Sequence, residues 1–219
     1  MATLSVIILA KNEQQNIKEC IETTVQFADE ILVIDDYSTD DTAEIAMSMG
    51  AKVAQHRMDG DWSQQRRYAV AKSTSEWILF LDADERISTE LRQEILAVLE
   101  RNEKKAFWIE RSNVFHHNKA THGVLRPDFV LRFMPKDGVM VEGVVHEKIS
   151  SSYPEGKLQG KMYHYTYDNW QQYFNKFNNY FLEAIPEYNK WKLVRMGFIT
   201  LGISGIKVIR VVYIRIIRC

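Results

Sequence analysis

The first hundred residues alternate between short apolar runs and segments in which apolar positions recur at helical spacing. The apolar runs are expected to be strands and occupy Leu4–Ala10, Glu30–Ile34, Ala51–Ala54 and the stretch that begins at Trp77. The intervening segments are expected to be helices over Glu13–Phe27, from Ser38 to Met49, over Gln64–Ser73 and over Thr89–Arg101. Repeated alternation of this kind predicts an α/β fold with a mostly parallel central sheet flanked by helices.

Acidic residues follow two of the predicted strands. The run Trp77–Leu81 has no polar break, which suits a strand buried on both faces, and it leads directly into Asp82, Asp84 and Glu85. The run Glu30–Ile34 leads in the same way into Asp35–Asp36. Because open α/β sheets bind ligands at the carboxyl ends of their strands, we expect both acidic pairs to face one crevice.

Carboxylates this close raise each other's pKa unless a cation neutralises them. Mg²⁺ or Mn²⁺ accepts one or two carboxylates and completes its coordination with phosphate oxygens and water. The alternative is that each aspartate caps the helix that follows it. This alternative suits Ser38–Asp40 better than Asp82–Asp84, after which Ser88 already offers a cap.

Composition narrows the class of protein. The chain has 219 residues, 46% of them hydrophobic, which is enough for one α/β domain with a substantial core. Its 28 basic and 29 acidic residues give no nucleic-acid signature. Cys20 and Cys219 form neither a metal spacing nor a disulfide framework, and the apolar start is too short for a signal peptide. We therefore expect a cytoplasmic protein.

Three motifs, LSVIILAKNE, ILVIDDYSTDDT and QRRYAVAKSTSEWILFLDADE, resemble the successive nucleotide-sugar motifs of family 2 glycosyltransferases. The resemblance implies the GT-A fold, a single Rossmann-like α/β domain, and an inverting transfer of a sugar from a nucleotide-sugar donor. A further stretch, VEGVVHEKI followed by MYHYTYDNW, is similar to the subgroup that adds hexoses to the lipopolysaccharide inner core, notably the heptose β-1,4-glucosyltransferases.

The resemblance assigns the first crevice to a uridine nucleotide. The floor beneath the uracil would be formed by Ala10, Lys11, Asn12 and Glu13. Asp36 would hydrogen-bond the base or ribose. The sequence does not separate the contribution of its neighbour Asp35 to this contact from that of Asp36. Tyr37 stands where the family commonly has Gly, so the turn is less free to adopt a positive φ.

The same resemblance places the diphosphate of the nucleotide beside Arg66 and Asp82-Ala83-Asp84. Arg66 matches a basic position near the diphosphate, and the alternative for Arg66 and its neighbour Arg67 is a solvated helix face. Asp82-Ala83-Asp84 matches the DxD motif, in which Asp84 would bind Mg²⁺ or Mn²⁺ and Asp82 would contact the ribose or the metal's waters. His164 matches a third metal ligand or diphosphate contact, with packing among tyrosines as the alternative.

An inverting transferase also needs a base that takes the proton from the acceptor hydroxyl. The resemblance favours Glu147, since His146-Glu147 matches a pair in the core-hexose subgroup, and Glu142 is its competitor. The alternative is that Glu147 pairs with Lys148 or Arg132 on a surface strand. Residues 112–126 are expected to form a loop over the acceptor.

The tail differs in composition from the rest of the chain. Residues 190–219 carry seven basic and no acidic side chains, interleaved with apolar ones. We expect a catalytic domain over 1–185 and a helical basic extension over 186–219 that lies on the inner face of the cytoplasmic membrane. A homodimer interface is the alternative, and residues 208–217 would also suit a strand.

The expected substrates follow from the resemblance: a UDP-hexose, with glucose favoured over galactose, and a glycan or glycolipid acceptor such as the lipopolysaccharide core. Two other functions remain open. A sugar-1-phosphate nucleotidylyltransferase would share the fold, although it usually has a Gly-rich loop where this chain has LAKNE. A non-catalytic membrane-associated scaffold would use the tail alone.

Overall fold

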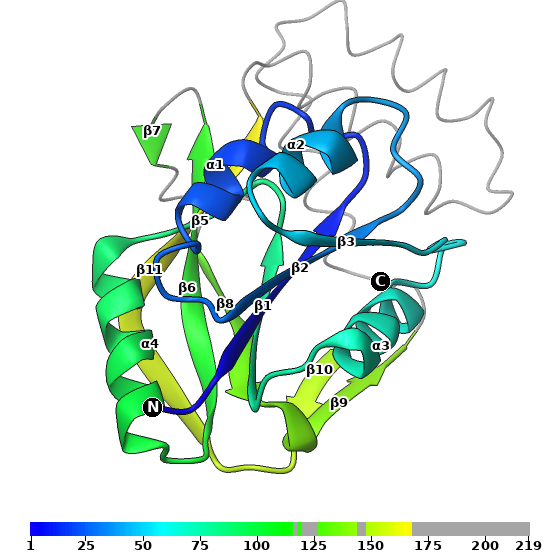
Figure 1. The fold of residues 1–219 in the computed structure, drawn as a ribbon. Coiled ribbons are helices and arrows are strands. Elements are labelled where there is room, and N and C mark those ends of the chain that lie inside the picture. Colours follow the sequence, from blue (N-terminus) through cyan, green and yellow to red (C-terminus); the bar gives the residue numbers. More distant parts are fainter. Residues whose placement is uncertain (116–117, 120–126, 144–147, 168–219) are drawn as a thin grey trace, which may run out of the picture. The chain divides into compact units, whose positions relative to one another are not determined.

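Four strands form the parallel half of the central sheet, in the order β3 (Lys52–Gln55), β2 (Glu30–Asp35), β1 (Leu4–Ala10) and β4 (Trp77–Asp82) (Figure 1). This computed structural model describes residues 1–115, 118–119, 127–143 and 148–167. All of them belong to one compact unit, Met1–Asn169. The parallel pairing of these strands was predicted from their alternation with helices.

The second half of the sheet is mixed. The strand β8 (Asp128–Pro135) runs antiparallel to both β4 and β6 (Ala106–Phe115), while β11 (Glu155–Tyr167) runs parallel to β6 and antiparallel to β5 (Glu85–Ile87). The short β7 (Asn118–Lys119) also pairs with β6. A separate hairpin is formed by β9 (Val139–Glu142) and β10 (Lys148–Ser151), after the 3-10 turn Lys136–Gly138.

One part of the predicted acceptor loop is wrong. Ser112–Phe115 belong to β6, because they pair with β11 on one side and, at Val114 and Phe115, with β7 on the other. Residues 116–117 and 120–126 of the predicted loop lie outside the described residues.

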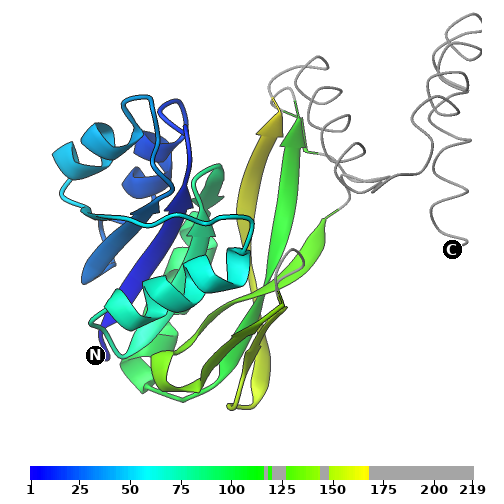
Figure 2. The ribbon, with the colours of Figure 1, turned by 90° about the vertical axis from the view of Figure 1, so that its right-hand side faces the viewer.

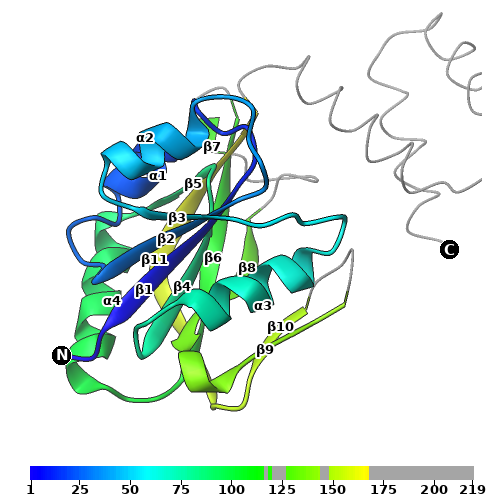
Figure 3. The same cartoon turned by 45° about the vertical axis from the view of Figure 1, so that its right-hand side comes forward.

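Helices cover both faces of the parallel strands. Val6 and Ile8 of β1 pack in the cluster that holds α1 (Ile17–Glu22), α2 (Thr42–Ser48) and α4 (Thr89–Arg101). Ile7 and Leu9 point the other way, toward α3 (Trp62–Lys72) and the β9–β10 hairpin, which lie side by side (Figures 2 and 3). Because both faces are covered, the strands can be apolar at every position.

The strand β4 is buried along its whole apolar run. All residues of Trp77–Leu81 are buried, and the Trp77 ring centroid lies 4.8 Å from that of Phe133 and 6.5 Å from that of Phe107. Aromatic pairs of this kind contribute about 0.5–1.5 kcal/mol beyond the burial of their area. The unbroken apolar run therefore anchors the strand that ends at Asp82.

The predictions for the tail concern residues that the structure does not describe. The predicted domain boundary between 185 and 186 lies outside the described residues. The same holds for the basic extension over 186–219 and for the membrane or dimer contacts predicted for it. Among the helices of the described part, none has both the length and the hydropathy to cross a membrane.

Candidate active site

The two acidic pairs lie at one edge of the sheet, on either side of the end of β1. In the strand register Ala10 is opposite Asp35 and Leu9 is opposite Asp82. The carboxyl ends of β2 and β4 thus flank the end of β1, as the sequence predicted. Asp35 is in turn opposite Gln55, which brings the loop after β3 to the same edge.

Hydrogen bonds made by Asn12 and Glu13 hold the loop after β1 against the loop after β2. The Asn12 backbone N donates to Ser38 Oγ (2.9 Å), Thr39 N donates to Asn12 Oδ1 (2.8 Å), and Glu13 N donates to Thr42 Oγ1 (2.7 Å). Asn12 has a φ of 54°, a left-handed conformation that asparagine tolerates better than most residues. Asn12 and Glu13 therefore join the end of β1 to the loop after β2.

The structure distinguishes Asp35 from Asp36. Asp35 is fully buried, and its carboxylate accepts from Ser38 N at 3.2 and 3.3 Å, so it stabilises the turn. Asp36 joins the loops on both sides: it forms an ion pair with Lys11 Nζ (2.7 Å) and accepts from Met58 N (3.2 Å). Of the two, Asp36 is the residue at the junction of the three strand-end loops.

Asp82 is neutralised by two buried arginines. Its Oδ1 accepts from Arg66 Nη2 (3.0 Å) and its Oδ2 accepts from Arg132 Nη2 (2.8 Å). Burial alone would raise the pKa of Asp82, but the charges of Arg132 and Arg66 hold it well below its usual range. The sequence predicted Arg66 here; Arg132 was considered only as a partner of Glu147, because no local pattern places β8 beside β4.

Glu85 is a further member of this cluster that the sequence did not assign. Its Oε2 accepts from Asp82 N (2.8 Å), while its Oε1 lies 3.8 Å from Arg132 and 3.6 Å from Arg111. Complete burial and the nearby charge of Asp82 raise the pKa of Glu85, against the opposing effect of Arg132. Glu85 therefore fixes the backbone of the DxD turn from inside the core.

Asp84 and His164 face each other beside this cluster. Asp84 Oδ2 lies 3.2 Å from His164 Nε2, and His164 Nδ1 lies 2.7 Å from Asn113 Oδ1. Burial by itself lowers the pKa of His164, but the hydrogen bond and charge of Asp84 outweigh it, so the pKa is raised. In the protonated ring Nε2 donates to Asp84 and Nδ1 donates to Asn113, and loss of the Nε2 proton would free that nitrogen to bind a cation.

This pair fits a hard divalent cation. Adjacent ligands of an octahedral ion at about 2.1 Å are about 3 Å apart, close to the separation of the Asp84 and His164 atoms. A histidine that donates its other nitrogen to a carbonyl oxygen is the usual arrangement of a metal-ligating imidazole. In the described part of the chain no group of three or more His, Cys, Asp or Glu side chains is arranged for a metal. Phosphate and water would have to complete the coordination.

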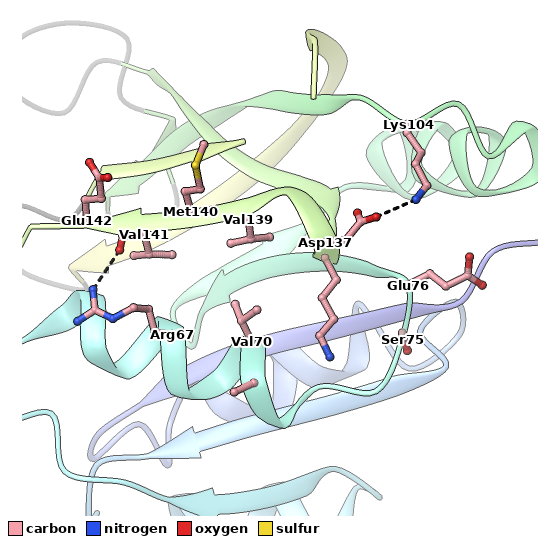
Figure 4. A pocket seen from close by; sticks show the side chains of 12 residues that line it. Arg67, Val70, Ser75, Glu76, Lys104, Asp137, Val139, Met140, Val141 and Glu142 are labelled. Carbon is pink, nitrogen blue, oxygen red and sulfur yellow. Dashed lines mark hydrogen bonds and ion pairs between the residues drawn. The ribbon is translucent and has the colours of Figure 1, made fainter. Parts of the chain in front are cut away.

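Of the two candidate bases, the structure describes only Glu142. Glu147 lies outside the described residues. Glu142 is exposed at the end of β9, where its backbone O accepts from Ser63 Oγ (3.0 Å), and no contact between described residues joins it to the strand-end cluster. Its carboxylate points away from α3 (Figure 4).

A cavity of about 680 Å³ lies between α3 and β9 (Figure 4). Val70 and Ala71 of α3 and Val139 and Val141 of β9 line it, with charged residues at its rim. Arg67 closes one end, because its Nη1 donates to Val141 O (3.0 Å). Arg67 thus fastens the hairpin to α3, on the other side of the helix from the strand-end site.

The family follows from a comparison of the whole chain with family models. The model of glycosyl transferase family 2 matches residues 5–181. The chain belongs to this family. The match includes every strand-end residue described above and confirms the family predicted from the three motifs, together with its GT-A type of α/β fold. The lipopolysaccharide subgroup is not distinguished by this match.

Several relatives of the chain are glycosyltransferases from Rickettsia species. One from Rickettsia typhi, itself uncharacterized, is 28% identical over 210 residues, which cover 90% of this chain and 70% of the relative. One from Rickettsia felis is 40% identical over 95 residues, which cover 43% of this chain but only 33% of the relative. The chain thus spans about a third of several of its relatives.

Two solved structures are also similar. Staphylococcus aureus TarS in complex with UDP is 26% identical with a TM-score of 0.47, over 56% of this chain and 38% of TarS. Mycobacterium tuberculosis glucosyl-3-phosphoglycerate synthase, solved with Mn²⁺, UDP and phosphoglyceric acid, is 21% identical with a TM-score of 0.42, over 52% and 43% of the two chains.

Proposed function

We propose that this family 2 glycosyltransferase moves a hexose from a UDP-sugar to a hydroxyl of a saccharide or lipid-linked acceptor, in a reaction that depends on Mn²⁺ or Mg²⁺. The observation that carries the proposal is the pairing of Asp84 with His164 beside the arginine-bound Asp82. Glucose is the favoured sugar and the lipopolysaccharide core the favoured acceptor, on the resemblance of VEGVVHEKI and MYHYTYDNW to that subgroup.

The nucleotide would bind between the ends of β1, β2 and β4. Asp36 would accept hydrogen bonds from the base or ribose, above the floor formed by Ala10, Asn12 and Glu13. Arg66 and Arg132 place two guanidinium groups beside Asp82, where they would contact the diphosphate. Asp82 would hold these guanidinium groups in place and contact the ribose.

Asp84 and His164 would hold the divalent cation, and Asn113 would orient the imidazole. When bound there, the cation would stabilise the negative charge that develops on the leaving diphosphate. Glu147 is the proposed base that takes the proton from the acceptor hydroxyl as that oxygen attacks the anomeric carbon, with Glu142 as its competitor. The basic residues of 186–219 would keep the enzyme on the inner face of the membrane, or join two copies.

A screen of nucleotide-sugar hydrolysis tests this proposal. We expect UDP-hexoses to be hydrolysed faster than GDP- or ADP-sugars, and only with Mn²⁺ or Mg²⁺. Asp84→Asn should abolish the metal-dependent rate, whereas Asp137→Asn, an exposed site at the far end of the hairpin, should not change it. Equal rates for all nucleotides, or full activity of Asp84→Asn in chelator, would refute the assignment.

A further inference from the structure

Tyr37, at the end of β2, adopts a backbone conformation that its side chain does not favour. Its φ is 50°, a left-handed value that costs a residue with a Cβ about 1–2 kcal/mol. The hydrogen bonds of the next residue hold the turn in place: Ser38 N donates to Asp35, and Ser38 Oγ accepts from Asn12 N. Such strain persists where neighbouring structure imposes it, and it is concentrated at functional sites.

The Tyr37 ring is not used for core packing. The residue is 47% exposed, although the strand that leads to it is buried throughout. The Arg57 guanidinium carbon lies 4.8 Å from the ring centroid, so a planar cation packs on one face of the ring. A glycine here would remove the backbone strain. The backbone conformation therefore does not explain why an aromatic residue occupies this position.

Tyr37 and Arg57 contact each other next to Asp36. Tyr37 follows Asp36 directly, and Arg57 precedes Met58, whose backbone N donates to Asp36 Oδ1 (3.2 Å). The carboxylate at the junction of the three loops is therefore accompanied by an exposed aromatic ring with a cationic support. A flat, uncharged aromatic ligand with polar edges would find both a hydrogen-bond acceptor and a stacking surface here.

We propose that Tyr37 is the stacking residue for the nucleobase of the donor, with Arg57 supporting the opposite face of the tyrosine ring. This inference rests on the proposed function, in which Asp36 contacts the base or ribose. In this arrangement Asp36 binds a polar edge and Tyr37 covers one face of the base. Stacking of a base on an aromatic side chain is tolerant of base identity, so Tyr37 supplies affinity for a nucleoside diphosphate over inorganic diphosphate.

Calorimetry on the full chain with Mn²⁺ tests the proposal, with UDP and inorganic diphosphate as the two ligands. We expect Tyr37→Gly to weaken UDP binding by about 5- to 100-fold and to leave diphosphate binding unchanged. Tyr37→Asn, which also tolerates a positive φ, should behave in the same way if the glycine variant is less stable. Tyr37→Phe keeps the ring and should retain wild-type affinity for UDP.

The outcomes separate this inference from the function on which it rests. If the wild-type protein binds UDP more tightly than diphosphate and Tyr37→Gly binds UDP equally well, the stacking role is refuted and the proposed function stands. An equal loss for both ligands in the Gly and Asn variants also refutes stacking, because it indicates general damage to the site. If the wild-type protein binds neither UDP, GDP nor ADP, both proposals fail.

Discussion

The site is built by side chains that satisfy one another in the absence of substrate. Asp82 is held by two guanidinium groups, and Asp84 by an imidazole whose second nitrogen is engaged by Asn113. These contacts come from α3, β8, β11 and β6, so four separate elements fix one pair of aspartates. A site preorganised in this way loses little free energy to rearrangement when charge develops in it.

Asn113 provides a test at the residue scale. Replacing Asn113 with Ala should weaken Mn²⁺ binding by about 10- to 100-fold, because His164 loses the acceptor that orients its ring. Asn113→Asp keeps a carbonyl-type oxygen at the same place and should bind Mn²⁺ at least as well as wild type. Titration calorimetry with Mn²⁺ in the presence of UDP measures both; equal affinities for wild type and Asn113→Ala would exclude the orienting role.

At the scale of elements, the helix caps decide where α3 and α4 begin. Asp61 accepts from Gln64 N at the start of α3, and Ser88 accepts from Leu91 N at the start of α4. Ser88 Oγ also accepts from Lys161 N of β11 (3.3 Å), so this cap joins α4 to the strand that carries His164. The cap thus links helix stability to the position of a site strand.

Ser88→Ala should lower the free energy of unfolding by about 1–2 kcal/mol, because both the helix cap and the contact to β11 are lost. Thr89→Ala, at the neighbouring exposed position within α4, is the control and should change stability by less. Urea denaturation followed by circular dichroism measures both variants. Similar losses for the two substitutions would contradict the capping role of Ser88.

Glu30 joins three elements at the edge of the sheet opposite the site. Its carboxylate binds Lys52 Nζ (2.9 Å), Thr74 N (2.8 Å) and the Ser5 hydroxyl. Burial would raise the pKa of Glu30, but these partners outweigh it and lower the pKa from 4.5 to about 2. The carboxylate therefore contributes stability that is fully present above pH 4.5 and is lost as the pH falls toward 2.

Glu30→Gln should consequently reduce the free energy of unfolding at pH 7 by about 3 kcal/mol. The difference from wild type should shrink as the pH falls through 4.5 toward 2, where the wild-type carboxyl also becomes neutral. Glu100→Gln, an exposed site on α4, is the control and should show no such pH dependence. A difference that is constant between pH 7 and pH 2.5 would contradict the account.

At the scale of the whole molecule, the local sequence pattern predicts the elements whose formation depends mainly on neighbouring residues. Leu4–Ala10 and Thr89–Arg101 have the predicted bounds. A mainly apolar run determines the ends of the first, and an N-cap with an amphipathic repeat determines the ends of the second. The helix predicted over Glu13–Phe27 is shorter, Ile17–Glu22, because the residues before it bond to the loop after β2.

Long-range pairing could not be predicted in this way. Arg132 reaches Asp82 only because β8 runs antiparallel beside β4, and His164 reaches Asp84 only because β11 pairs with β5. The strand pattern placed Asp82 and Asp84 at the end of β4, and the family resemblance supplied Arg66, whereas Arg132 and Asn113 depend on tertiary contacts between distant segments. The family resemblance supplied His164, which spacing alone would not have singled out.

In the proposed function Asp84 and His164 hold a divalent cation against the diphosphate of a uridine nucleotide. Anomalous diffraction from crystals soaked with Mn²⁺ and UDP tests it most directly. We predict a manganese peak within coordination distance of Asp84 Oδ2, His164 Nε2 and a phosphate oxygen. UDP bound at the strand ends while Asp84 and His164 remain in direct contact, with manganese elsewhere or absent, would contradict the claim.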